Sequence, residues 1–377
     1  MIIGVLKEQA PETRVSLVPE VVAAIVKMNV TVWVEDGAGL TAFFNNKAYE
    51  DAGAVIKDEA TIAREADIML TIQPDNLPSG LKPAAAVLGV YQPLFNPELM
   101  SQWADKGLTV FSMDTIPRTT RAQSMDVLSS QANIAGYKAV LLAATSYSRY
   151  FPMFMTAAGS IAPAKVLILG AGVAGLQAIA TARRLGSVVE VFDTRPAVKE
   201  EVMSLGAKFV EVEGAADASK AGGYAVEQSE EFQAKQKAKI HEHARKADII
   251  ITTAQIPGRK APILITTQML EDMRPGSVIV DLAASTGGNT ELTENNKTVM
   301  HHGVAIIGTS TLPATMPSDA SKLYSKNVLN FLKLIINKEG GINLNWEDDI
   351  VKGTCIVFDG KIVNDRIQSL LPSKANA

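Results

Sequence analysis

The sequence predicts an α/β protein with two Rossmann-like parallel-sheet domains that are separated by a cleft and linked by a long helix. Two stretches carry this prediction, residues 1–115 and the residues from Lys165 onward. In both, short runs rich in Val, Ile and Leu alternate with helical patterns. Such alternation implies a parallel sheet that helices cover on both faces. A length of 377 residues also suggests two domains.

The expected elements follow from hydrophobic periodicity and from helix-starting Pro and Asn residues. In the first series, strands are expected at 2–6, 30–35, 68–72, 86–91 and 108–113, and helices at 19–28, 46–53, 60–66 and 96–107. In the second series, strands are expected at 165–169, 188–192, 208–212, 248–254, 277–283 and 304–308. The linking helix is expected from about Gln131 to Phe151, where it would form the floor of the cleft.

The C-terminal part is expected to return to the first domain. Residues 322–338 carry an apolar stripe at helical spacing, and a hairpin is expected to turn at Asp359–Gly360. The predicted domains are therefore 1–127 plus 320–377, and 128–319. In the second domain, a Gly-, Ala- and Ser-rich segment at about 213–231 is either a disordered surface insertion or a lid.

Composition excludes several classes of protein. The net charge of -4 and the pI near 5.7 give no electrostatic case for nucleic acid. The single cysteine, Cys355, allows no disulfide framework and no thiolate metal cluster, and it fits a reducing, cytoplasmic compartment. The N-terminus lacks the features of a signal peptide, and the apolar runs are too short or too broken to span a bilayer. A role at a membrane would therefore need a partner.

The strongest local motif is KVLILGAGVAGLQAIATARRLGSVVEVFDTR. Gly170, Gly172 and Gly175 form G-x-G-x-x-G between an apolar strand and a helix, and Asp193 ends the next strand. In a dinucleotide site, these glycines permit a tight turn, backbone approach to the pyrophosphate and close helix packing. Asp193 would accept hydrogen bonds from the adenosine ribose and repel a 2′-phosphate. NAD(H) is therefore favoured over NADP(H), although Arg195, two residues on, weakens this preference slightly.

Residues for acid–base chemistry and metal binding are scarce. A dehydrogenase that acts on an alcohol or amine must move a proton as well as a hydride. The four histidines are His241, His243, His301 and His302, so none lies in the first half of the chain. His241 and His243 are two residues apart and do not share a helix face, which makes them a poor metal pair. All four are expected to be surface residues, and no metal site is predicted.

Several longer motifs carry a family resemblance. GVLKEQAPETRVSLVPEVV, at Gly4 to Val22, resembles the opening shared by alanine dehydrogenases and the NAD(H)-binding domain of proton-translocating nicotinamide nucleotide transhydrogenase. RAQSMDVLSSQANIAGYKAV, FPMFMTAAGSIAPAKVLILGAGVAGLQAIATARRLG, AGGYAVEQSEEF and MRPGSVIVDLA are similar to the transhydrogenase branch. The resemblance covers essentially the whole chain, and motifs of this length are far more specific than the glycine fingerprint.

Departures from alanine dehydrogenase separate the two branches. The resemblance implies that alanine dehydrogenases hold pyruvate with an arginine and a lysine and use a catalytic histidine and aspartate. Arg14 matches the arginine, but the lysine position falls at Gln73. The histidine position falls at Gln92 and Pro93, and the aspartate position at Ser285. No basic or acidic group remains in those three motifs to carry out amino-acid dehydrogenation.

The resemblance also implies roles for a polar stretch, Ile116–Ser130. Its residues Arg118, Gln123, Asp126 and Ser129 match those that surround the dihydronicotinamide in transhydrogenases. Gln123 would reach toward the NADP(H) of a partner, while Arg118 and Asp126 would orient the carboxamide and ribose. A helix N-terminal cluster is the alternative interpretation of the Ser and Asp residues. Arg121 either belongs to the group around the dihydronicotinamide or is structural. The remaining NAD-site residues would be Val173, Tyr224 on the mobile loop, Thr253, Ala254 and Gln255.

The implied protein is the NAD(H)-binding subunit of a proton-translocating transhydrogenase in its split form. NADP(H) would be held on a partner beta subunit, because the chain contains one convincing dinucleotide fingerprint. A separate membrane-spanning subunit would carry the protons. The resemblance further implies a homodimer docked on the cytoplasmic face of the membrane. Two alternatives stay open: an alanine dehydrogenase-like NAD-dependent oxidoreductase, and an NAD-binding regulatory protein without turnover.

Overall fold

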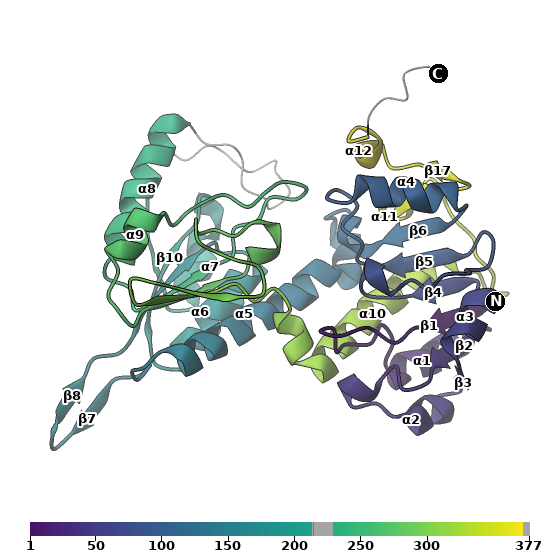
Figure 1. The fold of residues 1–377 in the computed structure, drawn as a ribbon, viewed down its shortest axis with the longest axis horizontal. Helices are drawn as coiled ribbons and strands as arrows, with labels where there is room; N and C mark the ends of the chain where they lie inside the picture. The colour runs from purple at the N-terminus through teal and green to yellow at the C-terminus, as the bar shows by residue number, and fades with distance from the viewer. Residues whose placement is uncertain (213, 215–228, 372–377) are drawn as a thin grey trace. The chain divides into compact units, whose positions relative to one another are not determined.

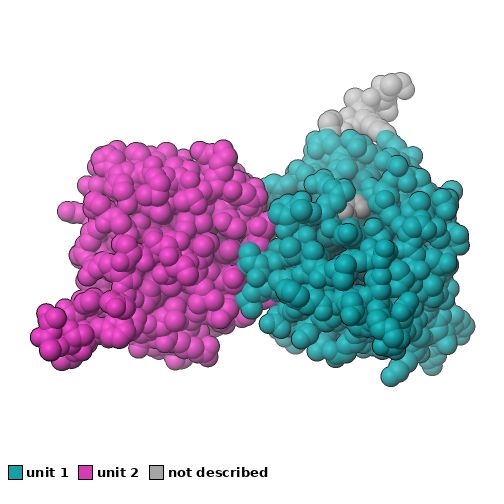
Figure 2. Space-filling model, turned by 60° about the horizontal axis from the view of Figure 1, so that its bottom comes forward, with its two compact units in different colours: residues 1–131, 314–377 teal, residues 132–313 magenta. Residues whose placement is uncertain are grey.

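The computed structural model describes residues 1–212, 214 and 229–371. Its chain forms two compact units, coloured separately in Figure 2. Unit 1 consists of residues 1–131 and 314–377, and unit 2 of residues 132–313. Helix α5 (Val127–Ser146) begins in unit 1 and continues into unit 2. The expected linking helix is therefore present, about four residues earlier than the sequence pattern indicated.

In its described residues, unit 1 contains an eight-stranded sheet in the order β17-β16-β6-β5-β4-β1-β2-β3. The pairs from β3 to β6 are parallel, while β16 pairs antiparallel with both β6 and β17. The strands are β1 (Ile2–Val5), β2 (Thr31–Glu35), β3 (Val55–Lys57), β4 (Ile68–Leu70), β5 (Ala86–Gly89), β6 (Thr109–Ser112), β16 (Cys355–Phe358) and β17 (Lys361–Ile362). The sheet is mostly parallel because helices connect successive strands.

Helices cover both faces of this sheet (Figure 1). They are α1 (Pro19–Val26), α2 (Asn46–Asp51), α3 (Glu59–Glu65), α4 (Pro97–Asp105), α10 (Pro317–Ile335), α11 (Asp349–Thr354) and α12 (Asp365–Gln368). One core joins α1, α10 and α11 to the sheet, and the other joins α3, α4 and α12 to it. Along β4, Ile68 and Leu70 enter the first core and Met69 the second, which is the period of two that a strand imposes.

The described part of unit 2 contains a seven-stranded sheet in the order β11-β10-β9-β12-β13-β15-β14. All its pairs are parallel except the antiparallel pair of β14 with β15. The strands are β9 (Lys165–Leu169), β10 (Val188–Phe192), β11 (Lys208–Phe209), β12 (Ile249–Thr252), β13 (Val278–Asp281), β14 (Thr298–His301) and β15 (Val304–Ile307). Strand β9 is therefore central, with β10 on one side and β12 on the other.

Two cores also flank the sheet of unit 2. Its helices besides α5 are α6 (Val173–Arg184), α7 (Lys199–Ser204), α8 (Glu230–Ala244) and α9 (Thr267–Glu271). Val166 and Ile168 of β9 pack with α5, α6 and α7, whereas Leu167 and Leu169 pack with α8 and α9. A separate two-stranded hairpin, β7 (Phe154–Thr156) with β8 (Gly159–Ile161), projects from unit 2 (Figure 1).

The sequence prediction of a two-domain, mainly parallel α/β fold is confirmed, with differences in detail. Strands β3, β7, β8 and β14 were not predicted, because they are short, exposed or antiparallel additions to the alternating pattern. The strand expected at 208–212 is only Lys208–Phe209. Most of the expected loop at 213–231 lies outside the described residues. Among the helices that the structure describes, none is both long and apolar enough to cross a membrane.

Candidate functional site

The carboxyl edge of the unit 2 sheet has the topology of a ligand site. The chain leaves β9 toward β10 on one side and arrives at β12 on the other, so the strand order reverses between β9 and β12. In open α/β sheets, ligands bind at such a reversal, beyond the carboxyl ends of the strands. Gly170 follows β9 there, and Thr253 follows β12.

The three glycines after β9 have different local environments. Gly170 has a φ of +105°, and a Cβ on it would lie 2.3 Å from Thr253 Oγ1. A Cβ on Gly175 would lie 1.9 Å from the carbonyl oxygen of Gly170, so only glycine lets α6 pack this close to the turn. A Cβ on Gly172 would meet nothing within 4 Å. Two glycines therefore shape the turn, and the third faces open space.

Helix α6 begins at Val173 with Gly172 as its N-cap, and no side chain of the cap residue bonds to this end. The first N–H groups of a helix lack internal partners, and the helix dipole adds partial positive charge there. Val173 is 39% exposed. This helix start can therefore bind an anionic group such as a pyrophosphate through backbone N–H groups alone.

Asp193, directly after β10, bonds to two neighbouring residues. Its Oδ2 accepts hydrogen bonds from the N–H of Ala171 at 2.7 Å and from Nη2 of Arg195 at 2.7 Å. Its Oδ1 accepts bonds from the N–H and from Nε of Arg195, both at 2.8 Å. The hydrogen bonds and charge of Asp193 raise the pKa of Arg195 despite partial burial. A ribose that bonds to Asp193 therefore has to replace Arg195, a competition that the sequence pattern did not reveal.

Thr253, Ala254 and Gln255 follow β12 on the same edge. Thr253 Oγ1 donates to the carbonyls of Leu169 and Gly170, which ties this segment to the glycine turn. Gln255 is exposed, and its Nε2 donates to the carbonyl of Leu282 at 2.9 Å. Thr253 therefore links the loop after β12 to the loop after β9, the two loops between which the strand order reverses.

Two buried residues that sequence reasoning missed, Asn289 and Asp281, support this edge. Asn289 Oδ1 accepts from the N–H of Ala254 at 3.0 Å, and its Nδ2 donates to the carbonyl of Ala254 at 2.8 Å. Asp281 Oδ2 in turn accepts from the N–H of Asn289 at 2.6 Å. Both side chains are fully buried. The available signal was an acidic residue at the end of an apolar strand, in VIVDLA.

In unit 1, the polar stretch Ile116–Ser130 forms a 3-10 helix, η4 (Thr120–Met125), and the start of α5. Asp126 Oδ1 accepts from the N–H of Ser129 at 2.8 Å, and Asp126 Oδ2 accepts from Ser129 Oγ at 2.6 Å. This is the geometry of a helix N-cap. The structure thus brings Asp126 and Ser129 together. Their contacts to each other are those of a helix cap, as the alternative interpretation of these residues expected.

The other three residues singled out in the polar stretch are Arg118, Arg121 and Gln123, and they do not share one environment. Gln123 is exposed on η4, and Arg118 is exposed in the loop before it. Arg121 forms a bidentate pair with Asp348 and also contacts Asp349 at the start of α11. These contacts tie η4 to α11, so Arg121 has a structural role, which was one of the two interpretations of its place in the sequence.

A second strand-end cluster follows β1 in unit 1. Arg14 donates through Nε and Nη2 to the two carboxylate oxygens of Glu12, at 2.8 and 2.6 Å, and through Nη1 to Gln131 at 2.8 Å. Burial alone would raise the pKa of Glu12, but the bonds and charge of Arg14 outweigh it and hold that pKa below its usual range. The charge of Arg14 is therefore already compensated inside unit 1.

Glu8, in the same cluster, is buried and held by backbone N–H groups. Its Oε1 accepts from the N–H of Ile72 at 2.6 Å, just after β4. Burial raises the pKa of Glu8 to about 8, although the N–H bonds from Ile72 and Gln73 act to lower it. The carboxyl group of Glu8 therefore holds its proton in neutral solution.

Two family models match the chain in tandem. The model described as the alanine dehydrogenase/PNT N-terminal domain matches residues 4–135, and the one described as the C-terminal domain matches residues 139–365. The chain belongs to the alanine dehydrogenase/PNT family.

Members of this family resemble the chain to different degrees. An NAD(P) transhydrogenase subunit alpha protein of Rickettsia prowazekii is 46% identical over 97% of this chain and 96% of its own length. A crystal structure of transhydrogenase from Sinorhizobium meliloti, also 46% identical, aligns with a TM-score of 0.87 over 96% of this chain and 100% of its own. An alanine dehydrogenase of Staphylococcus epidermidis is 28% identical over 90% of this chain and 88% of its own length. The chain is thus more similar to these transhydrogenases than to this alanine dehydrogenase.

The positions at which alanine dehydrogenases are expected to carry catalytic groups lie at the ends of strands. Gln73 follows β4, Gln92 lies in the loop after β5 with a φ of +48°, and Ser285 is exposed after β13. Near Gln92, Asp114 accepts a hydrogen bond from Ser112 Oγ, and burial of its carboxyl raises its pKa. Of the NAD-site residues expected from the sequence, Tyr224 lies outside the described residues.

Proposed function

We propose that this chain is the NAD(H)-binding subunit of a proton-translocating transhydrogenase. In this proposal, NADH on this chain passes a hydride to NADP+ held by a partner beta subunit, and a membrane-spanning subunit couples the reaction to proton movement. The chain would bind the cytoplasmic face of the membrane through those partners. The observation that carries the proposal is the 46% identity to a transhydrogenase alpha subunit protein over nearly the full length of both chains.

The proposed reaction suits the residues that are present. A hydride moves from C4 of the dihydronicotinamide of NADH to C4 of the nicotinamide of NADP+, giving NAD+ and NADPH. No proton enters or leaves either substrate, so the site needs alignment of the two rings and exclusion of water rather than an acid or base. Polar side chains that orient a carboxamide and a ribose meet that need.

The residues take the following roles in this proposal. NAD(H) binds through the glycine turn and helix start at Gly170, Gly172, Val173 and Gly175, with Asp193, Thr253, Ala254 and Gln255 beside it. Arg118, Gln123, Asp126 and Ser129 hold the dihydronicotinamide. The 2.6 Å bond from Ser129 Oγ to Asp126 also caps α5, and it fixes the orientation of the carboxylate that this proposal places beside the dihydronicotinamide.

An alanine dehydrogenase-like activity is the second candidate, and the state of Arg14 argues against it. Such an enzyme would use this arginine to bind the carboxylate of pyruvate. Arg14 instead makes a bidentate pair with Glu12 and a further bond to Gln131. Gln73, Gln92 and Ser285 also supply no proton donor at the expected catalytic positions.

A homodimer is part of the proposal, and the β7–β8 hairpin supports it. An isolated two-stranded hairpin is at best marginally stable in water. This one exposes Met153, Phe154 and Met155, the last to 78%. A second copy of the chain would cover these side chains. Light scattering should report a dimer for the wild type and a monomer for Met155→Glu, whereas Met203→Glu, at an exposed position on α7, should stay dimeric. A dimeric Met155→Glu protein would remove the hairpin from the interface.

The central experiment mixes the purified chain with a purified NADP(H)-binding transhydrogenase domain. Reduction of an NAD analogue by NADPH is followed, and NADH oxidation with pyruvate and ammonia is measured in parallel. We expect hydride exchange that requires both proteins and no turnover of pyruvate. Pyruvate turnover by this chain alone would reject the proposal in favour of the alanine dehydrogenase branch.

The role of Gln123 is tested in the same assay. Gln123→Asn shortens the amide by one methylene at the reacting end, so hydride transfer should slow much more than NADH binding weakens. Gln102→Asn, an exposed residue of α4, is the matched control and should change neither quantity. An equal loss of rate and affinity in Gln123→Asn would contradict the proposed role.

A further inference from the structure

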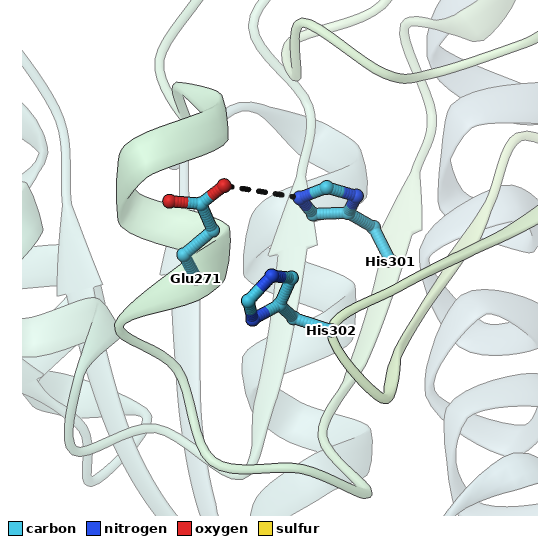
Figure 3. A group of neighbouring side chains, drawn as sticks. All are labelled: Glu271, His301 and His302. Carbon is cyan, nitrogen blue, oxygen red and sulfur yellow. Dashed lines mark ion pairs between the residues drawn. The ribbon is translucent and has the colours of Figure 1, made fainter.

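Three potential metal ligands meet at one end of unit 2. Glu271 is the last residue of α9, His301 is the last residue of β14, and His302 begins the turn to β15. One ligand atom from each residue lies within 4.8 Å of the other two, and Nε2 of His301 is 3.6 Å from Oε1 of Glu271. Figure 3 shows both rings on the side of the strand that faces Glu271.

The backbone at His302 brings the two rings together. Consecutive side chains in a regular strand point to opposite faces, which would separate His301 from His302. His302 has a φ of +47°, a left-handed conformation that is uncommon outside glycine, and the ring centroids are only 5.0 Å apart. The N–H of Gly276 donates to the carbonyl of Gly303 at 2.7 Å and anchors the turn that follows. The backbone conformation of this turn therefore places the two histidine rings side by side.

His301 has an unsatisfied nitrogen at this place. Its Nε2 is buried and has no hydrogen-bond partner among the described residues. The 3.6 Å to Glu271 is too long for a hydrogen bond. Buried polar atoms are nearly always paired in folded proteins, so a lone ring nitrogen aimed at a carboxylate requires an explanation.

A metal ion between the three side chains explains this spacing. Zinc binds imidazole nitrogen and carboxylate oxygen at about 2.0–2.2 Å, which puts two ligands of a tetrahedral ion about 3.3–3.6 Å apart. The observed 3.6 Å fits that separation directly. His302 and Glu271 are exposed, so their side chains can close the remaining distances by rotation.

We propose that Glu271, His301 and His302 form a binding site for a divalent transition-metal ion, with Zn²⁺ as the best match. Two imidazoles and one carboxylate suit Zn²⁺ better than Mg²⁺ or Ca²⁺, which prefer oxygen ligands. Water completes the coordination. The sequence did not predict this site, because Glu271 is distant in the chain and adjacent histidines in a strand normally diverge.

The site has a structural role, because it lies far from the nucleotide edge. Strand β15 is parallel to β13, so its start at Val304 is at the amino edge of the sheet. The glycine turn at Gly170 follows the carboxyl end of β9, at the opposite edge. Bound metal would join α9 to the β14–β15 turn and would stabilise the native state by mass action without contacting NAD(H).

A neighbouring pair provides the matched control. Nε2 of His241 lies 2.7 Å from Oδ2 of Asp272, the residue after Glu271. This histidine is already paired and does not belong to the three-residue group. His241→Gln therefore removes a histidine from the same surface and leaves the proposed ligands intact.

The test is calorimetric titration of the chelator-treated, full-length protein with ZnCl₂, together with thermal unfolding. The wild type should bind one Zn²⁺ per chain and melt at a higher temperature with Zn²⁺ than with chelator. His302→Gln and Glu271→Gln should each weaken binding about tenfold or more. His241→Gln should bind like the wild type. Both ligand variants change exposed side chains, and circular dichroism confirms that they fold.

A second readout separates a built site from loose surface binding. Co²⁺ in the same site should give visible absorption bands of a low-coordinate ion, and Zn²⁺ should remove them. Affinities that are equal in the wild type and the Glu271→Gln/His302→Gln double variant would overturn the proposal, as would loss of binding in His241→Gln alone. NADH affinity should be the same with and without Zn²⁺, and a change would contradict the structural role.

Discussion

The first strand of each sheet occupies an equivalent position, but the loops that follow these two strands are very different. Strand β1 lies between β2 and β4, and β9 lies between β10 and β12, so the strand order reverses at the same point in both units. After β9, the chain makes a glycine turn that ends at the start of α6, where the N-cap Gly172 provides no side-chain hydrogen bond. After β1, it runs through Glu8, Glu12 and Arg14, whose side chains are buried.

The same strand order therefore leaves backbone N–H groups available to a ligand in unit 2, but it is accompanied by internal hydrogen bonds in unit 1. In unit 2, the strand-order reversal presents backbone N–H groups and open space beside Gly172, which suits an anionic ligand. In unit 1, the carboxyl of Glu8 accepts the N–H of Ile72 at the corresponding place after β4. There, a side chain of the protein itself takes up a backbone N–H group that could otherwise bind a ligand. Strand order provides the crevice, and the loop residues decide whether a ligand can enter.

The largest expected effect tests the closed cluster of unit 1. Glu12→Gln removes the charge that compensates Arg14, so a buried guanidinium loses its ion-pair partner. Breaking a buried pair in this way costs about 3–5 kcal/mol, which urea unfolding would measure. NADH affinity of the folded fraction should not change. Unaltered stability would show that the Arg14 cluster is more open than its hydrogen bonds indicate.

The next prediction concerns pH and Glu8, whose pKa is raised by burial from 4.5 to about 8. Between about pH 5 and 8, the native state keeps a proton that the unfolded chain has released. The free energy of unfolding should therefore fall as pH rises, by about 1.4 kcal/mol per pH unit from this group. Glu8→Gln should lack that component. Parallel pH profiles for the wild type and the variant would mean that Glu8 titrates normally.

Two alanine substitutions compare structural and ligand-facing glycines in unit 2. Gly175→Ala places a Cβ against a backbone oxygen and should destabilise the protein by about 1–3 kcal/mol. Gly172→Ala meets open space and should leave the melting temperature unchanged. It should nevertheless weaken NADH binding about tenfold, or about 1.4 kcal/mol, if the pyrophosphate approaches here. Fluorescence titration and calorimetry separate the two effects, and normal NADH affinity in Gly172→Ala would move the pyrophosphate elsewhere.

A last expected effect, similar in size to those of the two glycine variants, concerns Asp193 and its partner. Asp193→Ala should weaken NADH binding by about 1–3 kcal/mol, the range for hydrogen bonds to a charged group. Arg195→Gln is the companion variant, and it should not weaken NADH binding, because the ribose takes the acceptor positions that Arg195 fills. Asp193→Ala should also reduce the preference for NADH over NADPH, since it removes the carboxylate that would repel a 2′-phosphate. Unchanged NADH affinity in Asp193→Ala would place the ribose acceptor at another residue.

The sequence alone determined the elements whose signals are local. Alternating strands and helices predicted the mainly parallel α/β fold, and the spacing of Gly170, Gly172 and Gly175 marked the turn after β9. These signals depend on neighbours within about thirty residues, where periodicity and turn chemistry act directly. The edge strand β14 and the β7–β8 hairpin escaped prediction, because their residues are largely exposed and lack the buried apolar run that marked the predicted strands.

Only the tertiary structure decided which distant side chains share an environment. It showed that Arg195 occupies the acceptors of Asp193, and that buried Asn289 and Asp281 hold the loop after β12. It paired Arg14 with Glu12, buried Glu8, and set Glu271 beside His301 and His302. Hydrogen bonding and desolvation depend on distances that chain folding creates between remote residues. The sequence therefore specified the frame and the glycine turn, whereas the charge state and partners of each polar group followed from the packed structure.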